Sequence, residues 1–316
     1  MIILRRTLSV VMLCMTTLAV AAYAYSTYEV SRLEQQYPPV GTLSDVDGTT
    51  LHYVDSGTGD PIVLLHGASS SLMDFEASIA LPLRKNFRVI SIDRPGYGYS
   101  RRHPGQWNDP AIQARLVNSL LRRLGVERAT FVGHSLGGAV VMAYALAYPQ
   151  QTTRIVLLGG ATHPWESGVA WSNHVATWPV IGTVFRHTMI VPAGTVLLPK
   201  ALAEVFTPNP VTPNYAEDTR VRLALRPEPF FASAQDLLRL SPYLEKQSQL
   251  YASIDLPLLL ITGSADTIVP AWNHSNRLIK ILSNATLIEL PDTGHVPHHA
   301  QTRLVVKNIE EFIRQL

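Results

Sequence analysis

Short apolar runs recur along the chain and are separated by longer amphipathic stretches, which is the pattern of an α/β protein. The runs are rich in Val, Ile and Leu and show no polar alternation, as expected for parallel strands buried on both faces. They occupy Pro61–Leu65, Arg88–Ile92, Thr130–Val132, Arg154–Leu158, Leu258–Ile261 and Ala285–Leu290. Apolar residues at helical spacing predict a packing helix over Asp109–Leu124, and a final helix is expected over Gln301–Leu316.

This rhythm stops between about residues 161 and 250, where we predict several short helices and no strand. The segment is rich in proline and large aromatic residues, namely Trp165, Trp171, Trp178, Phe185, Phe206, Phe230 and Phe231. A connection of this length without strands is uncommon unless it has a function. We expect its aromatic residues to line an apolar pocket or to seal the insertion onto the core.

The N-terminal segment differs from the rest of the chain. Arg5 and Arg6 precede an almost charge-free run from Leu8 to Tyr25, which is near the minimum length for a bilayer span. Because arginines flank only the start of this run, the N-terminus is expected in the cytoplasm. We predict an anchor over residues 1–26 in a bacterial-type inner membrane, with the remaining chain facing the periplasm.

A cleaved signal peptide followed by secretion is the alternative, since Ala22-Tyr23-Ala24 fits the small-x-small cleavage pattern. Residues 27–40 predict a short helical stalk and a linker that ends at Pro38-Pro39. The folded domain is expected over residues 41–316 and starts with a hairpin whose turn is Asp47-Gly48.

Composition limits the classes of function. A chain of 316 residues that is 47% hydrophobic suits one large domain with an insertion. The net charge of +2, without a basic stripe, predicts no nucleic-acid partner. The single cysteine, Cys14, excludes an intrachain disulfide and a cysteine-based metal site. His163, His174 and His187 show no metal-ligand spacing, so we predict neither a metal nor a cofactor.

The apolar run at Thr130 ends in Gly133-His134-Ser135-Leu136-Gly137 and passes directly into an Ala-rich helical pattern. This Gly-x-Ser-x-Gly sequence between a strand and a helix is typical of a nucleophile elbow. Gly133 and Gly137 lack the side chains that would collide with the neighbouring strand and helix. Ser135 is therefore the candidate nucleophile.

A serine nucleophile needs a histidine base and a carboxylate that orients the histidine. Asp266 follows the buried run Leu258–Ile261, and His295 follows Ala285–Leu290. Both residues lie after strands of the parallel sheet, at the edge where open α/β sheets bind ligands. We predict a Ser135, Asp266 and His295 triad.

The order of Ser, Asp and His at successive strand ends resembles the α/β-hydrolase superfamily, from about Gly48 to the C-terminus. The resemblance implies a mostly parallel sheet with helices on both faces and a helical cap, at about 161–250, inserted after the sixth strand. His66-Gly67 after the strand Pro61–Leu65 looks like the family's oxyanion loop. By this resemblance, the backbone amides of Ala68 and Leu136 bind the oxyanion.

Several other polar residues compete for these roles. His298 and His299 are alternative bases and Asp292 is an alternative acid, but Gly294-His295 matches the terminal loop of the family. Asp93 is expected to pair with Arg94 or to cap backbone amides. His66 is expected to brace its loop, and His52 to be structural.

These residues predict a serine hydrolase that cleaves hydrophobic carboxylic esters, esterase-like or lipase-like, through an acyl-enzyme. A small hydrophobic acyl compound is the expected substrate. A serine at the elbow disfavours the related haloalkane dehalogenases and epoxide hydrolases, whose nucleophile is an aspartate.

Relatives use the same triad for carbon–carbon bond hydrolysis of ring-cleavage products and for cofactor-free haloperoxidase or perhydrolase chemistry. The first of these reactions needs a cationic cap residue, for which Arg186, Arg220 and Arg222 are candidates. A non-catalytic binding protein is a further alternative.

Overall fold

The computed structural model describes residues 2–103 and 108–315, with side chains from residue 6 onward. One sheet runs through the molecule with the strand order β1-β2-β4-β3-β5-β6-β7-β8. Its strands are β1 (Thr42–Val46), β2 (Thr49–Ser56), β3 (Pro61–Leu65), β4 (Arg88–Ile92), β5 (Ala129–His134), β6 (Thr152–Leu158), β7 (Leu258–Gly263) and β8 (Ala285–Leu290). β1 and β2 are antiparallel to their neighbours, and the other pairs are parallel. The predicted mostly parallel sheet is confirmed.

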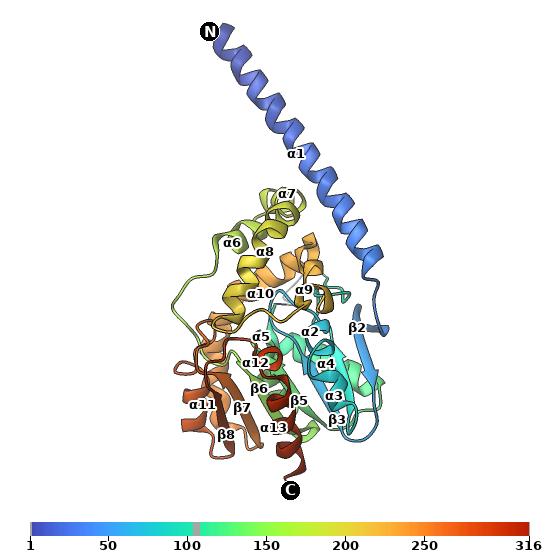
Figure 1. Cartoon of the computed structure of the whole chain (residues 1–316), viewed down its shortest axis with the longest axis vertical. Coiled ribbons are helices and arrows are strands. Elements are labelled where there is room, and N and C mark those ends of the chain that lie inside the picture. Colours follow the sequence, from blue (N-terminus) through green and yellow to red (C-terminus); the bar gives the residue numbers. More distant parts are fainter. Residues whose placement is uncertain (1, 104–107, 316) are drawn as a thin grey trace.

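Helices cover both faces of this sheet (Figure 1). The helices outside the segment between β6 and β7 are α1 (Ile2–Gln36), α2 (Met73–Glu76), α3 (Ala80–Leu83), α4 (Pro110–Arg123), α5 (Leu136–Ala147), η1 (Pro149–Gln151), α11 (Ser275–Ile281), α12 (Pro297–Ala300) and α13 (Thr302–Arg314). The final helix predicted over Gln301–Leu316 is confirmed as α13, and the short helix α12, which Pro297 starts, precedes it.

Alternate residues of each central strand enter two separate hydrophobic cores. Val63 and Leu65 of β3 pack with residues of α4 and α5, whereas Ile62 and Leu64 pack with residues of α3 and α13. This period of two explains why the strands are continuously apolar, since both faces are covered.

The insertion between β6 and β7 forms a helical cap, as the resemblance implied (Figure 1). Its elements are α6 (Trp171–Thr177), α7 (Ile181–Thr188), α8 (Ile190–Phe206), α9 (Tyr215–Asp218), η2 (Val221–Leu225), α10 (Pro227–Gln247) and η3 (Ser248–Ser253). Phe206 is fully buried, as a sealing residue would be. Trp171 and Trp178 are 68% and 51% exposed, so these two aromatics face outward and do not seal the cap onto the core.

Helix α1 projects from the body and packs on α7 and α8 of the cap (Figure 1). It continues without a break from Ile2 to Gln36, across the boundary between the expected anchor and stalk. Ser26 at that boundary is buried. The helix from Arg6 to Gln36 is long and apolar enough to cross a membrane.

Candidate active site

Ser135 occupies the sharp turn between β5 and α5, with φ 52° and ψ −121°. A non-glycine residue rarely adopts this conformation, so the surrounding structure must impose it. A Cβ atom at Gly137 would lie 2.1 Å from the Leu65 carbonyl oxygen, and one at Gly133 would lie 2.7 Å from that of Gly137. Both glycines are therefore required for the turn that leaves the Ser135 side chain partly exposed at the start of a helix.

Asp266 and His295 come together from the loops after β7 and β8. Asp266 Oδ2 accepts a hydrogen bond of 2.8 Å from His295 Nδ1. Its other oxygen, Oδ1, accepts from the amides of Ile268 and Val269, each at 2.9 Å. Burial opposes the charge on Asp266, but these donors hold its pKa below the usual value.

Burial lowers the pKa of His295 below its ordinary value of 6.5, although the adjacent Asp266 carboxylate acts in the opposite direction. With Nδ1–H donated to Asp266, the neutral ring carries its lone pair on Nε2. This is the tautomer that a general base requires.

A hydrogen bond places His295 beside the elbow. His134, the neighbour of Ser135, donates a hydrogen bond of 3.0 Å from Nε2 to the backbone oxygen of His295. Gly159 follows β6, and a Cβ there would lie 3.2 Å from Asp266 Oδ2 and 3.4 Å from His295 Nδ1. The three residues of the predicted triad thus lie at one edge of the sheet.

The loop after β3 passes directly against Ser135. A Cβ atom at Gly67 would lie 3.1 Å from the Cβ of Ser135. Within the described parts of the chain, the Ala68 amide has no hydrogen-bond partner. The Leu136 amide starts α5, where helical geometry leaves it without an intrahelical acceptor. Both amides suit the predicted role of oxyanion donors.

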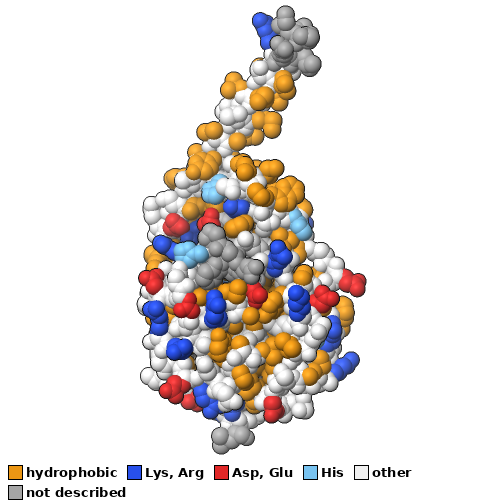
Figure 2. Space-filling view, turned by 180° about the vertical axis from the view of Figure 1, so that it is seen from behind, with side chains coloured by type: hydrophobic (Ala, Val, Ile, Leu, Met, Phe, Trp, Pro, Cys, Tyr) orange, Lys and Arg blue, Asp and Glu red, His pale blue; other side chains and the backbone are white. Residues whose placement is uncertain are grey.

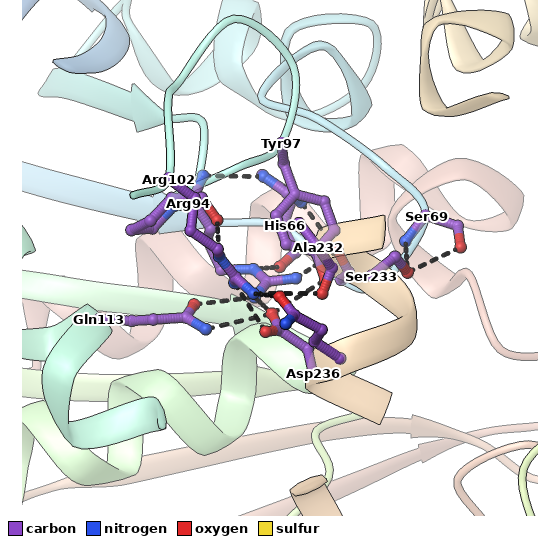
Figure 3. A network of polar contacts seen from close by, with 12 residues as sticks. His66, Ser69, Arg94, Tyr97, Arg102, Gln113, Ala232, Ser233 and Asp236 are labelled. Atoms are coloured by element: carbon purple, nitrogen blue, oxygen red, sulfur yellow. Dashed lines mark hydrogen bonds and ion pairs between the residues drawn. The ribbon is translucent and has the colours of Figure 1, made fainter. Parts of the chain in front are cut away.

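The side chain of Arg94 forms hydrogen bonds with the backbone of this loop (Figure 3). Its guanidinium donates to the carbonyl oxygens of His66, at 2.8 Å, and Gly67, at 2.9 Å. The Arg94 amide donates to His66 Nε2, and His66 Nδ1–H donates to the Gly67 carbonyl. Burial and the nearby Arg94 charge lower the pKa of His66 to about 4, so the ring is neutral in its expected bracing role.

Arg94 also forms an ion pair with Asp236 of the cap. The sequence analysis did not predict this pair. Arg94 Nη1 lies 2.9 Å from Asp236 Oδ2 on α10, and Asp236 Oδ1 lies 2.6 Å from Arg102 (Figure 3). Tyr97 and Gln113 also donate to Oδ2 of Asp236. Arg94 and Asp236 are 142 positions apart, and no local pattern marks the pair.

The alternative bases His298 and His299 bind a different carboxylate. Their Nε2 atoms lie 3.0 Å and 2.8 Å from the two oxygens of the buried Asp74. The ligand atoms of these residues lie within 4.8 Å of one another, which makes them the group in the described chain that could hold a metal ion. Their mutual hydrogen bonds account for the arrangement, and we assign no metal to it.

The remaining candidates have other partners. Asp93 accepts from the amides of Leu72 and Tyr99 and contacts His52, so it caps backbone and does not pair with Arg94. Asp292 is exposed, with its amide bonded to Ser264 Oγ.

The described residues also line two large cavities. One, of about 1120 Å³, lies between α1, the start of α10 and the loop around Gly96. The other, of about 1250 Å³, is lined by Asp266 together with Trp165 and Trp272. Neither of them is lined by Ser135 or His295.

Comparison with known proteins supports the architecture. Haloalkane dehalogenase 2 of Mycobacterium tuberculosis is 30% identical over 288 residues, covering 88% of this chain and 96% of the relative. A 2-hydroxy-6-oxononadienedioate/2-hydroxy-6-oxononatrienedioate hydrolase of Burkholderia vietnamiensis is 26% identical over 276 residues, covering 85% and 93%.

Solved structures share the fold. A thermophilic esterase from Thermogutta terrifontis superposes with a TM-score of 0.71 at 21% identity, covering 87% of this chain and 99% of the esterase. A meta-cleavage product hydrolase from Pseudomonas fluorescens IP01 gives 0.66 at 23% identity, covering 87% and 98%. Residues 60–300 match the family model described as alpha/beta hydrolase fold. The chain therefore belongs to the alpha/beta hydrolase family.

Proposed function

We propose that this protein is a serine hydrolase that cleaves hydrophobic carboxylic esters. The strained Ser135 backbone, at the same sheet edge as the hydrogen-bonded His295 and Asp266, is the observation that carries the proposal. Strain of this kind persists where the surrounding structure imposes it, and it is common at active sites.

In the proposed reaction, Ser135 Oγ attacks the ester carbonyl while His295 Nε2 takes the hydroxyl proton. Asp266 orients the imidazole and stabilises its charged form. The negative oxygen of the tetrahedral intermediate accepts hydrogen bonds from the amides of Ala68 and Leu136. The protonated His295 then gives its proton to the leaving alcohol, and water releases the acyl group by the same steps in reverse.

The proposal includes a membrane location. Helix α1 carries exposed apolar side chains from Leu8 to Tyr25, and the preceding arginines favour a cytoplasmic N-terminus. We place the catalytic domain on the opposite side, held at the bilayer by α1. A protein in this position suits substrates that partition into lipid.

The test is hydrolysis of nitrophenyl esters, from acetyl to palmitoyl, by the full chain in detergent, beside its Ser135→Ala variant. We expect Ser135→Ala to lower kcat by about 10³-fold or more, because no other group replaces the nucleophile. A fluorophosphonate probe, which labels activated serines, should label the wild type at Ser135. Esterase activity that survives in Ser135→Ala would refute the assignment.

Carbon–carbon bond hydrolysis is the second candidate, favoured by the similarity to the Burkholderia vietnamiensis hydrolase. That reaction was expected to need a cationic residue in the cap. In the structure, Arg186 donates to the Ala176 carbonyl and lies over the Phe231 ring, while Arg220 donates to the Pro38 carbonyl. Probe labelling at Ser135 without hydrolysis of any nitrophenyl ester, together with turnover of a ring-cleavage dienoate, would select this function.

A further inference from the structure

The outer surface of the cap carries a group of large apolar side chains. We define the cap patch as Trp171, Trp178, Val180, Ile181, Val184, Met189, Val196 and Leu197, which lie on α6, α7, α8 and the turns that join these helices. Each is between 48% and 78% exposed. Figure 2 shows hydrophobic side chains gathered where the projecting helix meets the body.

Helix α7 has its polarity reversed relative to a helix of a water-soluble domain. Its buried residues are Gly182, Arg186 and Thr188, whereas Ile181 and Val184 face outward. An amphipathic helix in water normally buries its apolar face. The outward apolar face is therefore suited to an apolar environment beyond the protein.

The charge distribution agrees with this reading. From Trp171 to Leu198, Arg186 is the sole Asp, Glu, Lys or Arg residue, and its side chain is buried. Helices α7 and α8 together are apolar enough to match a membrane span in composition, although they bend by 62°. Trp171 and Trp178 have the amphipathic rings that gather at membrane interfaces.

The contact between α1 and α7 indicates where the cap patch would lie relative to a membrane that α1 crosses. The Tyr23 ring stacks on His187 of α7, with ring centroids 6.2 Å apart. A hydrocarbon core of about 30 Å takes up about 20 helical residues, so a span that starts near Thr7 ends close to Tyr25. Helix α1 passes next to α7 (Figure 1), and the Tyr23 contact lies at the end of α1 where such a span would leave the hydrocarbon.

We propose that the cap patch inserts into the interfacial layer of the same bilayer that α1 crosses. The lipid bilayer is the occupant because the cap patch continues the apolar surface of α1 and carries no exposed charge. The inference rests on the membrane location proposed above and extends it. In this arrangement the cap binds the membrane together with α1. The outer face of the cap then faces the lipid.

The test measures how deeply single labelled cysteines lie in the bilayer. In a Cys14→Ser background, Val184→Cys and Val196→Cys report on the cap patch. Leu81→Cys on α3 is the matched control, because Leu81 is 66% exposed and α3 lies on the body, away from α7 and α8 (Figure 1). Native Cys14, labelled in the otherwise unchanged chain, reports on α1. Each full-length protein carries an environment-sensitive fluorophore in phosphatidylcholine and phosphatidylglycerol vesicles that contain a spin-labelled lipid quencher.

We expect the quencher to act roughly fivefold more strongly on labels at 184 and 196 than on the label at 81, since interfacial helices lie about 5–10 Å into the headgroup boundary. Quenching of Cys14 without quenching at 184 and 196 would overturn the inference while leaving the anchor in place. Labels at 184 and 196 that are shielded from aqueous iodide but not quenched by lipid would also overturn it, because a second protein copy would then cover the cap patch.

No quenching at Cys14 would overturn both the inference and the proposed anchor. Labelling depth does not depend on turnover, so an inactive esterase with a lipid-buried cap patch would refute the reaction alone. Adding Ile181→Asp to Val196→Cys should reduce the lipid quenching several-fold, because transferring a carboxylate on this face from water into lipid opposes insertion. Circular dichroism checks that this variant is folded.

Discussion

At His295, burial and the Asp266 carboxylate act on the imidazole in opposite directions, and burial dominates. The pKa of His295 is therefore below 6.5 and the ring is neutral at physiological pH, as a general base must be. Two hydrogen bonds fix the position of this base: Asp266 accepts from Nδ1 of His295, and His134 donates to its backbone oxygen.

The pH dependence of kcat/KM should report this pKa. Because the neutral base is the active form, activity is present above the pKa and is lost as the pH falls through it. We expect the acid limb of the wild type to have its midpoint below pH 6.5. Asp266→Asn should lower kcat by about 10⁴-fold, because the imidazole loses the partner that fixes its tautomer. A wild-type midpoint well above 6.5 would contradict the burial argument.

At the scale of single elements, different interactions stabilise the elbow and the cap connection, by which we mean the ion pairs that join Asp236 of the cap to the body. The elbow depends on missing side chains, since Gly133 and Gly137 allow β5, α5 and the β3 loop to approach closely. The cap connection depends on charge, since Asp236 of α10 is fully buried between Arg94 and Arg102. Each has a matched control elsewhere in the chain.

Gly137→Ala should destabilise the protein by more than about 2 kcal/mol, because the new methyl group meets the Leu65 carbonyl and backbone must shift. Gly168→Ala is the control, since no atom lies within 4 Å of a Cβ placed there, and its effect should stay within about 0.5 kcal/mol. Urea unfolding of both variants checks this. Equal effects would show that close approach is not the reason for glycine at 137.

Asp236→Ala should cost about 3–5 kcal/mol, because it leaves the guanidinium of Arg94 buried and unpaired. Glu204→Ala is the control within the same cap. Its carboxylate lies 3.9 Å from Lys200, and both side chains are exposed, so the cost should be below about 1 kcal/mol. Denaturant unfolding gives both values. A small effect of Asp236→Ala would mean that the cap is not fixed by this pair.

At the scale of the whole molecule, several buried histidines are held neutral. Burial is the main cause, and it lowers the pKa of His163 and His274 to about 4 and that of His298 to about 3. In the unfolded chain these residues titrate near 6.5. Between these values the unfolded state binds more protons than the folded state, so acid favours unfolding.

The free energy of unfolding should therefore be highest above pH 6.5 and should fall as the pH drops toward about 4, as the pKa of these histidines requires. His298→Gln should flatten this slope, whereas His174→Gln, at an exposed position, should leave it unchanged. Denaturant unfolding at about pH 7.5 and about pH 5 gives the comparison. Equal slopes in the wild type and His298→Gln would exclude His298 as a contributor.

The sequence alone determined the class of the sheet, the position of the cap and the elements that carry Ser135, Asp266 and His295. These features follow from local patterns, because a buried parallel strand is continuously apolar and a sharp elbow requires glycine. Only the tertiary structure decided which distant residues meet. Asp74 reaches His298 across 224 positions, and Arg94 reaches Asp236 across 142.

The direction of the cap side chains was also decided by the fold. The aromatic residues of the insertion were expected to face the protein, yet Trp171 and Trp178 face outward. Periodicity shows which residues share a helix face, but which face is covered depends on how the helices pack. The sequence could therefore supply the chemistry of the candidate site, while its bracing by the cap and the outward apolar surface required the folded chain.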